Sequence, residues 1–547
     1  MNKLDITEAT YGSAQWADHN DILRAGMYRK TSDSVFLGFY NRRALYGSGQ
    51  GGLVSCAAAR SGKLSTQIAY NVCGKNAVSR SCLILDPKGE IAEISQNQMF
   101  LRKACIYWNP TNFHGLPHVS INILDHIKAG SPTMVSDIKS FYEQWHPSTN
   151  FGNAKYFEIS AKDIAEAITV CDVELHGSTN IARIYDLVSQ LEQKTYEWLN
   201  FEFDMSQSTH QFVRRVAAEI KKHNASKNTN NNGGSMPSFL KELYTGFSCL
   251  NDPLLRASVS PPFNFSFADI CADNAQATNI YLMPPDDLID VWAPVIKGLL
   301  ENAYVHKSRH PRAIPQLWII DECGQLAKNG KFSLIVSLFV IGAGKNIKTW
   351  IFVQSLAQLD QLDREGQEQI LGSAAFQCYY AINELKTATY LSQGLGKTTI
   401  KVPDTLQQLE AKANAKRLGR LILEGDMSVD TLAEYALSKK AAVHQNKQGR
   451  DLLQPNEIMT QLSDQMIIRV KDAAKPIRAD RVHYFLHPSM VGAYHPNSEH
   501  SAGSAPDRVQ TPSGILRVIT QKVPRKYAHF PQYAQSGEWS FIEGYRP

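Results

Sequence analysis

Two blocks of the sequence alternate short apolar runs with longer segments of helical periodicity. The first block spans roughly residues 35–125 and the second roughly 275–400. Short apolar runs between helical patterns are typical of strands in a parallel sheet with both faces covered. We predict strands at Leu53–Ala57, Ser81–Leu85, Ala104–Trp108, Asn279–Met283, Leu317–Ile320, Thr349–Val353 and Gln377–Ala381. The pattern therefore predicts an α/β domain with a parallel-rich central sheet.

The region between the two blocks, roughly 130–260, contains few strand candidates. Helical periodicity is clear in Ala161–Val170, Ile181–Leu199 and Gln207–Lys222. A polar, Asn-rich run, Asn224–Ser235, predicts a flexible loop within this region. We therefore predict an all-α domain that is inserted into the α/β domain.

The remaining sequence is more polar. Residues 401–450 look helical and carry many Lys and Arg residues, which fits either a solvated helical face or a segment that contacts a nucleic-acid backbone. A strand pair is predicted within 461–486, and the Ser-, Pro- and Gly-rich run Asn497–Gly514 is predicted to be mobile. The predicted division is 1–34 as an entry segment, 35–129 and 263–490 as the two parts of the nucleotide-binding domain, 130–262 as the inserted all-α domain and 491–547 as a C-terminal tail.

Composition limits the class of protein only loosely. The chain has 547 residues, of which 43% are hydrophobic, so it can bury a large core and form more than one domain. A net charge of +5 permits an anionic partner such as DNA but is common in ordinary enzymes. The nine cysteines include no CxxC pair, which favours reduced thiols in the cytosol over a disulfide framework or a zinc site. We expect neither a signal peptide nor a membrane-spanning helix.

The segment Leu53–Ser65, LVSCAAARSGKLS, has the features of a phosphate-binding loop. A strand leads into a turn of small residues and then into a helix, so that backbone N–H groups and the helix dipole face an anion. Lys63 would reach the β- and γ-phosphate oxygens. The predicted nucleotide-binding residues are Ala59, Arg60, Ser61, Gly62, Lys63, Leu64 and Ser65.

This loop matches G-x-x-x-x-G-K-[ST] only in part, and an ordinary strand–turn–helix is the alternative interpretation. Ala57 stands at the first Gly position, and Leu64 stands where a hydroxyl normally holds Mg²⁺. Ser65 is the substitute candidate for Mg²⁺, but one step along a helix turns a side chain by about a quarter turn or more. Binding of a nucleotide is therefore better supported by this loop than its hydrolysis.

Two other strand ends carry polar residues that suit the same chemistry. Asp321 and Glu322 follow the apolar run LWII, where Asp321 can hold Mg²⁺ and Glu322 can polarise the water that attacks the γ-phosphate. The alternative is that Asp321 only caps a helix. Gln354 follows Thr349–Val353, at the place of a γ-phosphate sensor. Because ligands of open α/β sheets lie at the carboxyl ends of strands, we predict one site for ATP and Mg²⁺.

Several short segments over residues 10–486 form an ordered series. They are Tyr11–Ala17 (YGSAQWA), Ala59–Lys63 (ARSGK), Leu85–Glu90 (LDPKGE), Asn109-Pro110, Asn122-Ile123-Leu124, Trp318–Glu322, Val353–Leu359 (VQSLAQL), Ser392–Lys397 with Thr398, Arg450–Glu457 (RDLLQPNE), Lys475-Pro476-Ile477 and Tyr484. In this order the segments resemble the type IV coupling proteins, the TraG/TraD-type ATPases of conjugation and type IV secretion.

The resemblance implies a RecA-like P-loop fold with an inserted, membrane-distal all-α domain. It also implies a hexamer, which can be a monomer in isolation, that hydrolyses ATP and passes DNA or protein substrates to a type IV secretion channel. The implied partners are DNA, relaxase or relaxosome components or effector proteins, and the channel components. The implied location is the cytoplasm, peripheral at the inner face of the bacterial inner membrane.

The sequence departs from this family at its start, because the usual members begin with membrane-spanning helices. A naturally soluble variant, a shortened chain and a subunit with a separate membrane tether are the three interpretations. Two other functions stay open: a degenerate coupling protein that binds nucleotide and recruits substrates without hydrolysis, and a DNA pump outside secretion. Leu64 favours the first of these alternatives, whereas the family-like segments disfavour the second.

Overall fold

The computed structural model describes residues 11–74, 77–96, 103–145, 153–226, 236–327, 331–403, 405–424, 428–441, 445–498 and 507–545. Its centre is an 11-stranded sheet with the strand order β2-β1-β13-β12-β9-β3-β8-β7-β4-β6-β5. These strands are β1 (Val35–Tyr40), β2 (Arg43–Gly47), β3 (Leu53–Ala57), β4 (Ser81–Leu85), β5 (Ala104–Trp108), β6 (Thr278–Leu282), β7 (Gln316–Ile320), β8 (Ile347–Val353), β9 (Phe376–Tyr380), β12 (Gln465–Val470) and β13 (Ile477–Asp480).

The sheet consists of a parallel part and an antiparallel part. The strands from β9 through β3, β8, β7, β4 and β6 to β5 pair in parallel. The strands β12, β13, β1 and β2 extend it beyond β9 by antiparallel pairing. Every strand predicted from the apolar runs is present, and the predicted strand pair within 461–486 is β12 and β13. The hairpin of β1 and β2 was not predicted. A tight turn at Asn41 and Arg42 joins its two strands.

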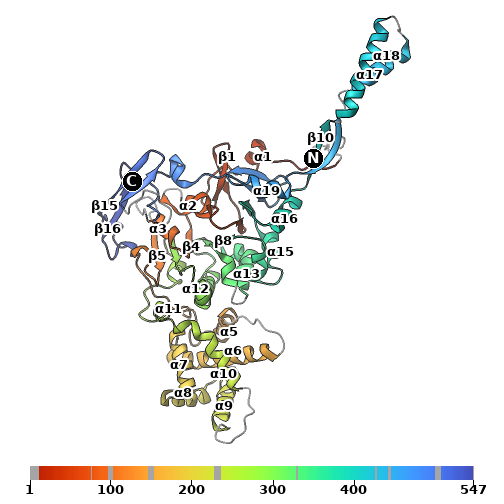
Figure 1. Ribbon diagram of the computed structural model, residues 1–547. Coiled ribbons are helices and arrows are strands. Elements are labelled where there is room, and N and C mark those ends of the chain that lie inside the picture. The colour runs from red at the N-terminus through yellow and green to blue at the C-terminus, as the bar shows by residue number, and fades with distance from the viewer. Residues whose placement is uncertain are drawn as a thin grey trace.

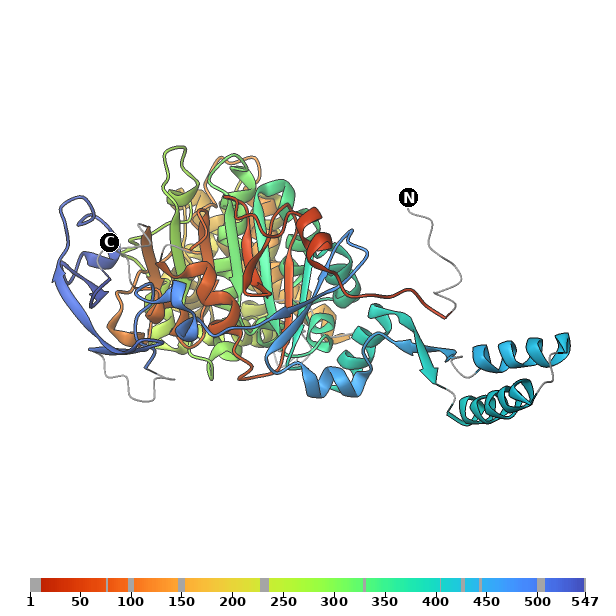
Figure 2. The same ribbon diagram turned by 90° about the horizontal axis from the view of Figure 1, so that it is seen from above.

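Helices cover both faces of the sheet (Figure 2). The pleat explains this arrangement, because alternate residues of a strand point to opposite faces. In β3, Val54 and Cys56 join one core and Leu53 and Ala57 join the other. Apart from the insertion and the arm described below, the α-helices are α1 (His19–Arg24), α2 (Ala69–Val72), α3 (Glu90–Ile94), α11 (Pro253–Ser258), α12 (Ile289–Arg309), α13 (Ser333–Ile341), α14 (Ala357–Leu362), α15 (Gly366–Ser373), α16 (Leu385–Leu395) and α19 (Pro455–Gln461).

The predicted helical insertion is present between β5 and β6 and forms the lower lobe of Figure 1. Its helices are α5 (Met134–Trp145), α6 (Asn153–His176), α7 (Ile181–Gln193), α8 (Tyr196–Gln207), α9 (Gln211–Ser226) and α10 (Met236–Phe247). The hydrophobic core of these helices is continuous with the core on one face of the sheet. Most of the predicted Asn-rich loop lies outside the described residues.

A separate arm projects from the opposite end of the molecule (Figure 1). Its stalk is an antiparallel ribbon of β10 (Lys397–Pro403) and β11 (Gln445–Asp451), and its tip is a pair of helices, α17 (Thr405–Leu423) and α18 (Val429–Ala441). The two helices pack against each other, and Ala411 and Leu418 of α17 are buried. Residues 401–450 are therefore largely helical, as predicted, but the ribbon on either side of the helices was not predicted.

The C-terminal residues correct the prediction of a tail. Strands β14 (Arg508–Thr511), β15 (Gly514–Lys522) and β16 (Glu538–Ile542) form an antiparallel sheet of their own. Gln532 bonds the backbone of edge strand β5, accepting from the N–H of Cys105 at 2.9 Å and donating to the carbonyl of Lys103 at 3.0 Å. Much of the predicted mobile run lies outside the described residues. No helix within the described ranges is long and apolar enough to cross a membrane.

Candidate functional site

The phosphate-loop candidate follows β3 and has the backbone of a tight anion-binding turn. Arg60 and Gly62 adopt positive φ angles of 56° and 81°. This left-handed conformation suits Gly62 because glycine has no Cβ. The following turn, Leu64–Ile68, is a π-helix that leads into α2, and the hydroxyl of Thr66 donates to the carbonyl of Gly62 at 2.8 Å. The sequence thus forms the predicted strand–turn–helix, with a widened first turn.

The structure brings the polar ends of three neighbouring strands together. Nζ of Lys63 lies 3.3 Å from Oε1 of Glu322, and the side-chain amide of Gln354 donates to Oε2 of Glu322 at 2.8 Å. Lys63 is buried, with an exposed fraction of 7%. These residues follow β3, β7 and β8, which are adjacent in the sheet. The predicted meeting of the three strand ends is therefore present, although the chemical role of each residue stays a prediction.

Two further carboxyl groups, the buried Asp86 and the partly buried Asp321, follow strands of the same part of the sheet. Burial raises the pKa of Asp321 to about 6, and nearby Lys63 partly opposes this shift. Burial also raises the pKa of Asp86 to about 7, although Asp86 accepts a hydrogen bond of 2.8 Å from the N–H of Ala92. Asp86 follows β4, the strand beside β7. The charge of Asp321 adds to the rise in the pKa of Asp86, and the charge of Glu322 adds to that of Asp321. A cation at this edge of the sheet would therefore favour both ionised forms.

Glu322 adopts a left-handed backbone conformation, with φ of 50°. A residue with a Cβ pays for this conformation by an amount on the order of 1–3 kcal/mol, and such residues cluster at functional sites. The carbonyl of Glu322 accepts from the N–H of Gln325, and its own N–H donates to Oδ1 of Asp321 at 3.0 Å. In this conformation the Glu322 side chain contacts Lys63 and Gln354.

The hydroxyl groups of the loop have different surroundings. Oγ of Ser61 is buried and has no hydrogen-bond partner within the described residues. Oγ of Ser65 lies 2.8 Å from Nδ1 of His483. The side chain of Leu64 packs against the core on the face of the sheet that Leu53 and Ala57 join. Ser61 therefore offers an unsatisfied polar group for a ligand, whereas Ser65, the substitute candidate for Mg²⁺, already has a partner.

Sequence reasoning missed two residues at this loop, Arg481 and His483. Both follow β13, and Arg481 donates hydrogen bonds to the carbonyl oxygens of Ser61 and Ser463. Lys475-Pro476-Ile477 and Tyr484 bracket this segment among the family-like residues, but spacing alone gave no reason to place it beside Gly62. Only the antiparallel extension of the sheet brings it there.

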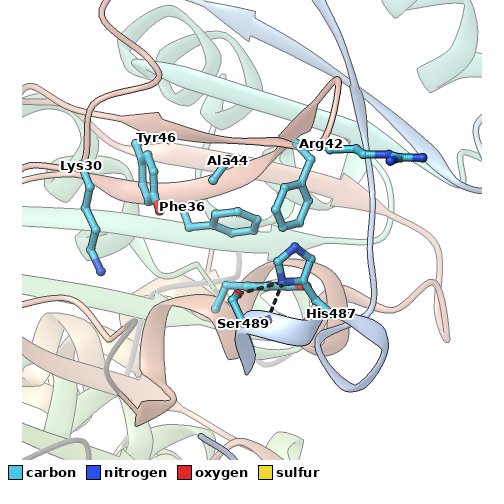
Figure 3. Close-up of a pocket in the computed structure, with 9 residues that line it drawn as sticks. Lys30, Phe36, Arg42, Ala44, Tyr46, His487 and Ser489 are labelled. Carbon is cyan, nitrogen blue, oxygen red and sulfur yellow. Dashed lines mark hydrogen bonds between the residues drawn. The ribbon is translucent and has the colours of Figure 1, made fainter. Parts of the chain in front are cut away.

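A cavity of about 140 Å³ lies on the α2 side of the sheet, outside the Lys63–Glu322–Gln354 network (Figure 3). Aromatic rings from β1 and α2 form its floor, and His487 stacks on Phe39 with ring centroids 4.7 Å apart. Its lining residues are Lys30, Phe36, Phe39, Arg42, Ala44, Tyr46, Tyr70, His487 and Ser489. The cavity contains none of the predicted site residues, so it is not the phosphate site.

Comparisons with known structures establish the fold. The bacterial conjugative coupling protein TrwBdeltaN70, in a trigonal form with sulphate, superposes with a TM-score of 0.56 at 13% identity, covering 86% of this chain and 93% of that one. TrwB in complex with ADP and Mg²⁺ gives a TM-score of 0.56 at 13% identity and covers 86% of this chain and 94% of that one. The chain therefore has the α/β fold of TrwB, with a mixed, mostly parallel sheet and the helical insertion α5–α10.

Comparisons with curated sequences point the same way. Protein VirD4 of Rhizobium radiobacter is 23% identical over 525 residues, covering 91% of this chain and 66% of that protein. The conjugal transfer protein TraG of Agrobacterium fabrum is 23% identical over 440 residues, covering 78% of this chain and 59% of that protein. The chain thus spans between about half and two thirds of the length of these relatives. A profile of the family described as "Type IV secretory system Conjugative DNA transfer" matches residues 7–506. The chain belongs to this family, the type IV coupling proteins of conjugative DNA transfer.

Proposed function

We propose that this protein is an ATPase that recruits DNA, nucleoprotein or protein substrates and drives their transfer to a type IV secretion or conjugation channel. The observation that carries the proposal is the network of Lys63, Glu322 and Gln354 at three neighbouring strand ends. A lysine on a phosphate loop, a carboxylate and an amide are the groups that phosphoryl transfer to water requires.

Each member of the network has a separate role in this proposal. Lys63 holds the β- and γ-phosphate oxygens, which replace the carboxylate of Glu322 as its partner. Glu322, released from Lys63, accepts the proton of the attacking water. The amide of Gln354 keeps the Glu322 carboxylate in place and senses the γ-phosphate. Ser61, whose hydroxyl is buried without a partner within the described residues, donates to a phosphate oxygen.

The residues at the edge of the sheet suit a bound Mg²⁺. Mg²⁺ keeps several waters and is held by one or two carboxylates together with the phosphates. Asp321 and Asp86, both with raised pKa values, supply such carboxylates. Asp321 would hold the ion through its water shell, and the ion would neutralise charge on the phosphate oxygens. Ser65 is the weaker candidate ligand because its hydroxyl is bonded to His483.

The comparisons support a nucleotide site of this kind. TrwB has been solved in complex with ADP and Mg²⁺ and in complex with a non-hydrolysable ATP analogue. We extend nucleotide binding from TrwB to the present chain because Lys63 lies buried at the corresponding type of loop. The family description supports DNA transfer, with relaxase or relaxosome components, effector proteins and channel components as partners. A hexamer at the inner face of the inner membrane, with or without a separate tether, completes the proposal.

A second candidate function is a nucleotide-dependent adaptor that recruits substrates without hydrolysis. Leu64 at the usual hydroxyl position favours it, as does the engagement of Ser65 by His483. Both functions require nucleotide binding at Lys63, so binding alone does not separate them.

Phosphate release with Mg-ATP, measured with and without single-stranded DNA, separates the two functions. We expect turnover in the wild type and its loss in Lys63→Ala and Glu322→Gln. Glu197→Gln, on an exposed position of α8, is the matched control and should retain turnover. Tight binding of nucleotide without turnover would support the adaptor function over the ATPase function. Turnover that survives in both site variants would contradict the proposed mechanism.

A further inference from the structure

The side chain of Arg481 is wedged against the phosphate loop from the antiparallel side of the sheet. Its guanidinium donates to the carbonyl oxygen of Ser61, and its Nε lies 3.4 Å from the hydroxyl of Thr66. A Cβ placed on Gly62 would lie 3.3 Å from Nη2 of Arg481, so the head group touches the residue that precedes Lys63. Arg481 therefore belongs to the wall of the loop.

The charge of Arg481 is not matched by a carboxylate at contact distance. Its other neighbours are the carbonyl oxygen of Ser463, at 2.7 Å, and the ring of Tyr380, whose centroid lies 4.0 Å from the guanidinium carbon. Within the described residues no ion pair with Arg481 is formed, and Asp464 acts on it only by longer-range attraction. Partly buried positive charges normally have an anionic partner. An anion bound at this end of the loop would therefore pair with the guanidinium charge of Arg481.

The strand order shows which part of a nucleotide would supply that anion. The loop follows β3, while Glu322 and Gln354 follow β7 and β8 on one side of it. Arg481 follows β13 and reaches the loop from the other side, over β12 and β9. If Glu322 and Gln354 act at the γ-phosphate, the phosphate chain extends over Lys63 toward Arg481.

We propose that Arg481 is a second cationic ligand of the nucleotide, which contacts the phosphate chain at its α- and β-phosphate end and fixes the direction in which the nucleotide lies across the sheet. The inference rests on the proposed nucleotide site at Lys63. It gives the loop, which lacks its usual first Gly and hydroxyl, a positive group from a distant part of the chain. An arginine suits this place because its planar head can bond the loop carbonyl and a phosphate oxygen at the same time.

The test compares the binding of Mg-ADP and of a non-hydrolysable Mg-ATP analogue to Arg481→Gln and Arg481→Lys. We expect Arg481→Gln to weaken both nucleotides by the same factor, about tenfold to a hundredfold, as for the loss of a charge-assisted hydrogen bond. Arg481→Lys, which keeps the charge but loses the paired N–H donors of the guanidinium, should retain part of the affinity. Arg478→Gln is the matched control, because Arg478 lies on β13 and bonds Gln465 instead of the loop. It should bind both nucleotides as the wild type does.

Other outcomes overturn the inference. Wild-type affinity in Arg481→Gln would show that no phosphate contact exists. Weaker binding of the ATP analogue alone would place Arg481 at the γ-phosphate. Equal losses in the Gln and Lys variants, with a lower melting temperature of the nucleotide-free protein, would make Arg481 a brace of the loop only. If the wild type binds neither nucleotide, or Lys63→Ala binds as well as the wild type, the proposed nucleotide site itself is wrong and the inference falls with it.

Discussion

The carboxylate of Glu322 is shared between two partners, Lys63 through Oε1 at 3.3 Å and the amide of Gln354 through Oε2 at 2.8 Å. The residue proposed to activate water therefore neutralises the residue proposed to hold phosphate. Nucleotide binding must break the Lys63–Glu322 pair, so the pair competes with the ligand.

This competition predicts opposite effects of Glu322→Gln on binding and on turnover. The amide cannot pair with Lys63 as an ion, so the affinity for Mg-ADP should stay equal or rise by a few-fold. Turnover should fall by about 10²–10⁴, as expected for the loss of a general base. Equilibrium binding and phosphate release on the same preparation check both expectations. A Glu322→Gln protein that binds Mg-ADP much more weakly than the wild type would contradict the competition.

Gln354→Ala should act on turnover and leave the binding of ADP nearly unchanged. The side-chain amide of Gln354 donates to Glu322. The backbone N–H of Gln354 donates to the side chain of Gln358 at 2.8 Å, so the backbone stays fixed after the truncation. We expect kcat to fall at least about tenfold and the Kd of Mg-ADP to stay within about twofold. The double variant with Glu322→Gln should be little worse than Glu322→Gln alone, because the two residues act as one unit. If the losses of turnover in Gln354→Ala and Glu322→Gln add fully in the double variant, the two residues act separately.

The raised pKa of Asp86 predicts that the stability of the protein depends on pH. Burial raises its pKa from 3.8 to about 7, so the folded state binds the proton more tightly than the unfolded state does. Its contribution to stability is therefore fully present below about pH 4 and is lost as the pH rises toward 7. Asp86→Asn, which keeps an oxygen that can accept from Ala92, removes this dependence. Thermal melts from pH 4 to 8 should show the variant gaining on the wild type as the pH rises, by an amount on the order of 1–4 kcal/mol. A difference between the two proteins that does not change with pH would exclude this explanation.

The arm offers a test of the two interpretations of residues 401–450. Four basic side chains of α17 are exposed on it: Lys412, Lys416, Arg417 and Arg420. If they contact the backbone of single-stranded DNA, their change to Gln should lower the slope of log affinity against log salt by up to about 3, at about 0.7 per contact. Binding of labelled single strands over a salt series measures the slope. The same change at Arg215, Lys221, Lys222 and Lys241 of the helical insertion is the control. Equal slopes in both variants would favour the interpretation of these residues as a solvated helical face.

The sequence predicted the parallel half of the sheet well because buried parallel strands appear as continuous apolar runs, as in SCLIL and ACIYW. It predicted the meeting of Lys63, Glu322 and Gln354 because the carboxyl ends of parallel strands share one edge. It did not predict the ribbon of the arm, because one of its strands, Gln445–Asp451, is polar throughout and pairs with β10 outside the central sheet.

Arg481 and His483 escaped prediction for a different reason. They reach the phosphate loop because β13 pairs with its near neighbour β12, and β12 pairs with β9, whose residues are distant in the sequence, as Val470 is from Phe376. The sheet of the C-terminal residues was not predicted either, because Trp539 and Phe541 pack in a cluster that includes Ala104 of β5, which is distant in the sequence. Local patterns do not encode such contacts.

The ribbon at the base of the arm places Lys397 directly opposite Asp451, so the chain leaves the body and returns to it at one point. Everything between these two residues is a cassette with adjacent ends. Its removal needs only a short turn to rejoin them, and its extension or exchange leaves the register of the central sheet untouched. A longer or shorter segment at this point would therefore change how far the arm extends from the body, without a change in the strands that carry Lys63, Glu322 and Gln354.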